Sequence, residues 1–339
     1  MNAEAKKKLS VPVAVLTAVA LVLLLILIHN PFTSKVPTST PIWWVSLTAP
    51  QYPKSAFPDG IRINFHVDGV FNGCHLIKSK EKSESQALDC KAEMDAINHY
   101  VGMYPISAGA PIERAVSPFV FALLALMLVA FAVPGKKARV GLLAVGCLAI
   151  GIWTYMGMYG QGGVHLLSSN YIADMQKTMD LDPGEYKDWS GYQSIQESYT
   201  DALGLYFRDP PEIKRRAAII GNATNIVVYG LLAAMVLLVV GNWFSRLFYW
   251  LMVVVPMALP VFFVIDYSGW LWWFGHNLNK MGAFTVKPFM PTVFGQGKVA
   301  QFATHSYPSV GFGVMVVMSV LLAALALLRR KEIKAGVAE

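Results

Sequence analysis

The sequence predicts an all-α polytopic membrane protein with six transmembrane helices and a small α+β domain between the first two of them. Six apolar stretches support this fold class, since each approaches the roughly 17–25 residues that a helix needs to cross a bilayer. They cover residues 11–29, 117–134, 139–158, 218–240, 247–268 and 308–328. Composition agrees with a membrane protein, because 55% of the residues are hydrophobic and only 14% are charged.

Basic residues give the predicted helices an orientation. An excess of Lys and Arg in short loops marks the cytoplasmic side of a membrane protein. Here the basic residues near both ends of the chain and in two short loops are Lys6, Lys7, Lys8, Lys136, Lys137, Arg139, Arg246, Arg329, Arg330, Lys331 and Lys334. Both termini are therefore expected in the cytoplasm, and all seven histidines on the opposite face. Lys214, Arg215 and Arg216 oppose this orientation only mildly, because the rule is weak in long segments. The net charge of +7 indicates contact with anionic lipid headgroups and no nucleic-acid partner.

The six helices divide the chain into seven parts. Residues 1–29 are expected to form a membrane anchor, 30–116 a periplasmic domain, 117–158 a transmembrane hairpin, 159–217 a periplasmic loop, 218–268 a second hairpin, 269–307 another periplasmic loop, and 308–339 the last helix with a cytoplasmic tail. A cleaved signal peptide is the alternative for the first part. Its long apolar run and the following His29-Asn30-Pro31-Phe32, which lacks a small-residue cleavage pattern, favour an uncleaved anchor. Pro256 and Pro260 predict a kink in the fifth helix.

The first outer segment carries strand and helix signals. Residues 61–67 alternate apolar and polar side chains, and Asp68-Gly69 after them is typical of a hairpin turn. A helix is expected near residues 91–103. Cys74 and Cys90 would lie in an oxidising compartment, where a disulfide is the default; a metal site that includes His75 and a free pair are the alternatives. Cys147 is expected to be a small buried residue.

Histidine and methionine occur close together at two places in the outer segments. His99 and Met103 would share one face of the helix near 91–103, and His276 is followed by Met281 in the last loop, which also contains His305. Imidazole and thioether groups together suit Cu(I). The alternatives are packing or capping at the end of the helix and a proline-rich loop packed on the membrane. Met175 and Met179 could extend a copper path, although amphipathic packing explains their spacing as well.

These outer motifs resemble a family. Residues 97–103 (INHYVGM), 275–278 (GHNL), Pro288-Phe289-x-Pro291, Phe302 and Ser306-Tyr307-Pro308 are similar to motifs of poorly characterised polytopic bacterial membrane proteins that are associated with gene clusters for copper handling and nitrous oxide reductase maturation. The chain differs from that family at Asn279-Lys280-Met281, where an acidic Asp-Pro type of turn is usual. The resemblance implies a setting in the bacterial inner membrane and in metalloenzyme maturation.

The function that these signals predict is a nonenzymatic accessory protein. It would bind copper on the periplasmic face through His99, Met103, His276, Met281 and His305 and pass it to a periplasmic metalloprotein. One alternative is a redox subunit that holds haem or quinol near that face, where His29, His165 and His276 could be ligands. A haem held deep in the bilayer is not favoured, because the spans contain no buried histidine. Covalent haem attachment is not supported, because the chain has no Cys-x-x-Cys-His. Another is a structural or permease subunit of a membrane complex. The common hydrolase and nucleotide-binding motifs are absent from the sequence.

Overall fold

Five long apolar helices and one broken pair of helices form the body of the protein. The computed structural model describes residues 10–29, 40–48, 61–63, 70–72, 90–299 and 302–335. In this part of the chain, five helices are long and apolar enough to cross a membrane: α1 (Val11–Ile28), α3 (Pro111–Ala132), α4 (Lys136–Tyr159), α7 (Pro210–Phe244) and α10 (Val310–Lys334). The pair α8 (Arg246–Met257) and α9 (Leu259–His276) makes a sixth span if it is taken as one. Five of the predicted apolar stretches therefore coincide with a single helix each, the stretch 247–268 coincides with the broken pair, and the chain is a multi-pass membrane protein.

The break between α8 and α9 confirms the kink predicted at Pro256 and Pro260. The two helices are bent by 62°, because a proline within a helix removes a backbone donor and its ring clashes with the preceding turn. The hydroxyl of Ser319 in α10 donates a hydrogen bond of 2.7 Å to the carbonyl of Met257, at the break. A side chain from a neighbouring helix thus stabilises the interrupted backbone.

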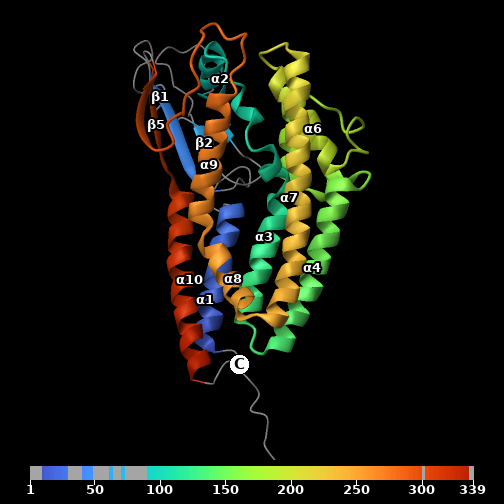
Figure 1. Cartoon of the computed structure of the whole chain (residues 1–339), viewed down its shortest axis with the longest axis vertical. Helices are drawn as coiled ribbons and strands as arrows, with labels where there is room; N and C mark the ends of the chain where they lie inside the picture. The colour runs from blue at the N-terminus through green and yellow to red at the C-terminus, as the bar shows by residue number, and fades with distance from the viewer. Residues whose placement is uncertain are drawn as a thin grey trace, which may run out of the picture.

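The long helices pack side by side in a bundle (Figure 1). Helix α1 packs against α3 and α10, α4 against α3 and α7, and α8 against α3 and α10. At the end of the bundle where α10 finishes, the buried Arg329 donates through Nε to the hydroxyl of Tyr249 at 2.8 Å. That hydroxyl in turn donates to the carbonyl of Phe131 at 3.2 Å. The three residues fasten α10, α8 and α3 together.

A small antiparallel sheet covers the opposite end, which we call the sheet end. Its strands are β1 (Trp43–Thr48), β2 (Ile61–Ile63), β3 (Val70–Asn72), β4 (Gly295–Val299) and β5 (Phe302–Pro308), in the order β3-β2-β1-β5-β4. The antiparallel pairing of β2 with β3 agrees with the predicted hairpin, whose turn lies outside the described residues. Two of the five strands, β4 and β5, come from the segment between α9 and α10, so residues 43–72 pair with a part of the chain that lies beyond the expected domain of residues 30–116. Trp43 and Ser306, joined by a 2.8 Å hydrogen bond, anchor β1 to β5.

Shorter helices complete the sheet end. They are α2 (Cys90–Tyr100), the 3-10 turns η1 (Ile106–Ala108) and η2 (Gly163–Leu166), α5 (Ser169–Met179) and α6 (Gly191–Gly204). Helices α5 and α6 were not predicted from the sequence. Each begins after a serine whose hydroxyl accepts a backbone N–H, Ser168 for α5 and Ser190 for α6. Met175 is buried in a core that α5 and α6 share with α3, as the packing interpretation of its spacing predicts.

Candidate metal-binding site at the sheet end

The first candidate pair lies where α2 ends. Helix α2 ends at Tyr100, and Gly102 after it has a positive φ of +82°, the left-handed conformation with which glycine commonly closes a helix. The backbone N–H of Met103 donates to the carbonyl of Asn98 at 2.9 Å and so completes the turn. Met103 lies beyond the helix, so the expectation that it shares a helical face with His99 is wrong. The glycine, as helix terminator, explains why.

The second candidate segment folds directly onto this turn. The backbone N–H of Asn279 donates to the carbonyl of Gly102 at 2.7 Å, and its Nδ2 donates to the hydroxyl of Tyr104 at 2.8 Å. Further along, the N–H of Phe284 donates to the carbonyl of Tyr100 at 2.9 Å. Two segments that are more than 170 residues apart in the sequence therefore meet. We call residues 99–104 together with 275–284 the junction.

Two glycines allow the backbones to approach this closely. A Cβ atom at Gly102 would lie 2.4 Å from the carbonyl oxygen of Asn279, and one at Gly282 would lie 2.6 Å from the nitrogen of Gly102. Real Cβ atoms do not make such short contacts, so a side chain at either position would push the segments apart. The junction depends on both glycines.

His276 is exposed to solvent, and one of its two ring nitrogens contacts a backbone carbonyl. It is the last residue of α9, it is exposed, and its ring stacks on Trp272 with centroids 4.6 Å apart. Its Nδ1 lies 3.0 Å from the carbonyl oxygen of Trp272. Because a carbonyl only accepts, Nδ1 must carry the proton in the neutral ring, which leaves the lone pair on Nε2. A histidine that binds a metal commonly has this backbone contact on its other nitrogen.

His99 lies deeper in the junction. Its ring packs against the rings of Tyr206 and Phe207, with centroid distances of 5.1 and 4.8 Å. Its Nδ1 is buried and has no hydrogen-bond partner in the structure. An unsatisfied buried nitrogen costs about 1–3 kcal/mol, and a ligand that reached this atom would recover part of that cost. Of the candidate residues, His99 therefore has the clearest unmet bonding capacity.

The two methionines of the junction differ in access. Met103 is only 7% exposed and is part of the core, whereas Met281 is 56% exposed. The N–H of Met281 donates to Oδ1 of Asn279 at 2.8 Å, so the same asparagine that attaches the loop also fixes the backbone at Met281. Met281 is the thioether available to an ion arriving from solvent.

His305 lies in the sheet, apart from this pair of segments. It is in β5, opposite Ser46 of β1 and Gln296 of β4, and the register places it on the face opposite to Ser306. Ser306 faces α9, because its hydroxyl lies 3.3 Å from that of Tyr267. Among the described residues, no three side chains of the types His, Cys, Asp and Glu gather into a metal-binding group. The histidines at 99, 276 and 305 thus do not form one three-imidazole site.

A buried arginine, Arg216, lies behind the junction and was not predicted from the sequence as a part of the site. Arg216 in the first turns of α7 is 3% exposed, forms an ion pair with Glu212 at 2.7 Å, and has its guanidinium 4.6 Å from the centre of the Tyr104 ring. Arg216 therefore packs α7 against Tyr104, whose hydroxyl accepts the hydrogen bond from Asn279. The one signal in the sequence that pointed to this arginine was the basic run 214–216, which does not follow the rule that Lys and Arg gather on the cytoplasmic side.

Burial also affects a phenol near this arginine. It raises the pKa of Tyr199 in α6 to about 12, although the hydrogen bond with Trp273 and the positive charge of Arg216 act in the opposite direction. Tyr199 therefore stays neutral at physiological pH. It contributes a polar contact to the packing of α6 against α9, and no charge.

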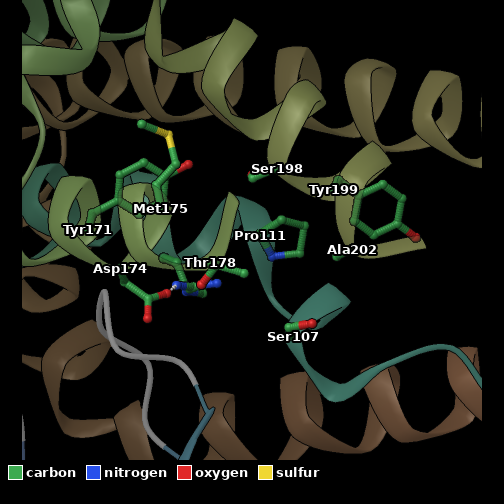
Figure 2. Close-up of a pocket in the computed structure, with 10 residues that line it drawn as sticks. Ser107, Pro111, Tyr171, Asp174, Met175, Thr178, Ser198, Tyr199 and Ala202 are labelled. Carbon is green, nitrogen blue, oxygen red and sulfur yellow. Dashed lines mark hydrogen bonds and ion pairs between the residues drawn. The ribbon is translucent and has the colours of Figure 1, made fainter. Parts of the chain in front are cut away.

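A small pocket lined by both polar and apolar side chains lies between α3, α5, α6 and η1 (Figure 2). Tyr171, Asp174 and Met175 come from α5, while Ser198 and Tyr199 come from α6, and Asp174 is paired with Arg114 of α3. The space open to the centre of a water molecule is about 20 Å³, which is enough for one or two waters. This pocket is too small for a haem or a quinol.

Cys74, part of the predicted disulfide with Cys90, lies outside the described residues.

Comparisons of the chain with protein-family models, with curated proteins and with solved structures give no match.

Proposed function

We propose that the chain is an inner-membrane accessory protein that binds copper transiently at the junction and passes it to a metalloprotein that is being matured. The observation that carries the proposal is the meeting of the two His/Met segments: the loop with His276 and Met281 is hydrogen-bonded onto the turn with His99 and Met103.

The donor chemistry favours copper among the metals. Thioether sulfur is a soft ligand that selects Cu(I), and imidazole binds copper as well. The donor side chains of the two His/Met segments are imidazole nitrogens and thioether sulfurs, so a metal held between these segments would have methionine among its ligands. Zinc, calcium and magnesium sites are normally built from nitrogen, thiolate or oxygen ligands and do not use thioethers.

Access divides the ligands into two kinds. His276 and Met281 are exposed and would receive the ion, with His276 offering Nε2 because its Nδ1 contacts the Trp272 carbonyl. His99, with its unpartnered Nδ1, and the buried Met103 would stabilise it from the protein side. His305 is on the sheet, so it would be a donor separate from these four residues. Because these ligands would not enclose the ion completely, the ion could leave the site again and pass to the partner protein.

A titration with Cu(I) tests this proposal. The detergent-purified protein is titrated under reducing conditions against a chromogenic Cu(I) chelator, and we expect one copper bound per chain. Ala at His276 or at Met281 should each weaken binding at least tenfold, which corresponds to about 1.4 kcal/mol, and His99→Ala combined with His276→Ala should abolish it.

His165→Ala is the matched control. His165 is also an exposed histidine at the sheet end with one ring nitrogen near a backbone carbonyl, that of Lys187 at 3.2 Å, but it lies on η2. Its replacement should leave copper binding unchanged. If the protein binds no copper, or if His276→Ala behaves like His165→Ala, the proposal is wrong. A Soret band in the visible spectrum would instead favour the redox subunit.

A further inference from the structure

The last outer loop has an unusual charge pattern. No acidic residue occurs between Asp266 and Glu332, whereas the same stretch contains Lys280, Lys287 and Lys298, all exposed. Surface loops normally mix both signs of charge. The loop therefore presents positive charge with no carboxylate of its own to neutralise it.

Large apolar side chains are exposed between these lysines. Phe284 is 65% exposed and contacts the ring of Tyr100, which is 54% exposed, with centroids 6.5 Å apart. Met281 and Met290 are exposed in the same loop. We call this surface the crest; it consists of Tyr100, Lys280, Met281, Phe284, Lys287 and Met290. Exposed aromatic and methionine side chains that lie together are typical of protein-binding surfaces.

The backbone of the crest is held in place. Hydrogen bonds from Phe284 to Tyr100 and from Asn279 to Gly102 fix its first part, and the N–H of Phe289 donates to the carbonyl of Gly275 at 3.1 Å. Binding to a fixed surface loses little conformational entropy, so its exposed side chains can contribute more of their contact energy to affinity. This favours a recognition surface over a loop that is simply unpacked.

The crest lies away from the lipid. Helix α1, with 18 residues, is about 27 Å long and matches the hydrocarbon core, whereas the 35 residues of α7 make it about 52 Å long. The excess of α7 extends toward the sheet end, where its Arg216 contacts Tyr104 of the junction. Figure 1 shows the loop over α2 at this end, well beyond the end of α1 and the start of α10. A soluble protein is a better occupant for this surface than a headgroup layer.

We propose that the crest docks a soluble partner protein that presents an apolar patch surrounded by acidic residues. The unneutralised lysines would select the acidic rim, while Phe284 and Tyr100 would fill the apolar centre. This deepens the proposed function and rests on it in one respect: Met281 belongs to both surfaces, so the ion would leave the junction within the docked complex. The docking surface itself does not require copper.

Site-specific photocrosslinking in the native host tests the docking surface. Phe284 is replaced with p-benzoylphenylalanine, and Leu205, also highly exposed and just after α6, carries the same group as a matched control. We expect one discrete adduct with a soluble acidic protein from position 284 and none from position 205. Lys280→Glu with Lys287→Glu should reduce that adduct at least fivefold, and Lys280→Arg with Lys287→Arg should preserve it.

Several results would overturn the docking proposal. These are the absence of an adduct at 284, an adduct with lipid or with a second copy of the chain, and an adduct that survives the change to glutamate. A thermal unfolding curve for each variant shows that the change acts on the surface and not on folding. The crosslink is measured with and without a copper chelator. Failure of the docking proposal can therefore be distinguished from failure of the copper-binding proposal.

Discussion

Replacing Gly102 with alanine should open the junction between the end of α2 and the loop that follows α9. Two separate penalties apply at this position. The backbone has φ +82°, a conformation that costs an L-residue about 1–2 kcal/mol. The new Cβ would also lie 2.4 Å from the carbonyl oxygen of Asn279, and overpacking of this kind costs about 1–3 kcal/mol. The sum is about 2–5 kcal/mol.

Two other glycines separate the penalties. Gly135 has φ +84° and nothing within 4 Å of its would-be Cβ, so Gly135→Ala carries the conformational cost alone. Gly282 has no positive φ, but its Cβ would lie 2.6 Å from the nitrogen of Gly102, so Gly282→Ala carries the steric cost alone. The Gly102 variant should therefore be the most damaging of the three.

Hydrogen exchange of the backbone amides is the appropriate assay, since it reports on local opening. In Gly102→Ala and Gly282→Ala, the amides of Asn279 and Phe284 should exchange at least tenfold faster than in the parent chain, and Cu(I) binding should weaken in parallel. In Gly135→Ala these amides should exchange at the parent rate. Equal exchange in the Gly102 and Gly135 variants would refute the argument that backbone contact holds the junction together.

Two further substitutions test other contacts. Asn279→Ala removes the hydrogen bond from Nδ2 to the Tyr104 hydroxyl and the one that Oδ1 accepts from Met281, so it should destabilise the loop by about 1–3 kcal/mol. Hydrogen exchange of the backbone amides of residues 280–284 measures this effect. Exchange at the parent rate would contradict the prediction. Tyr249→Phe removes the hydroxyl that accepts from the buried Arg329, which should cost about 1.5–3 kcal/mol. Its thermal unfolding midpoint is compared with that of Tyr155→Phe, an exposed phenol, and equal midpoints would show that the contact contributes nothing.

The membrane-spanning part of the fold could be predicted because its signal is local. Each long apolar run must form a helix to satisfy its backbone groups in lipid, so counting residues is enough to find it. Pro256 and Pro260 act through their own backbone and also leave a local signal. The helix lengths were less predictable, since α7 extends at its polar start well before the apolar run at 218.

The sheet and the junction depend on contacts between distant segments. The register of β1 with β5 joins Trp43 to Pro308, and nothing near either residue specifies the other. Likewise, the His99 and His276 motifs could be found as separate patterns, but their meeting depends on the fit of Asn279 against Gly102. The glycine itself was ambiguous in the sequence, where a helix continuing to Met103 and a helix ending before it were both plausible.

X-ray absorption at the copper edge tests the central proposal most directly. The Cu(I)-loaded protein should show both nitrogen and sulfur scatterers around the metal, as expected for imidazole and thioether ligands. Met281→Leu, which keeps a similar apolar volume, should lower the sulfur contribution, and His276→Ala should lower the nitrogen contribution. A spectrum with nitrogen or oxygen neighbours alone, or one that neither substitution changes, would show that the junction is not the copper site.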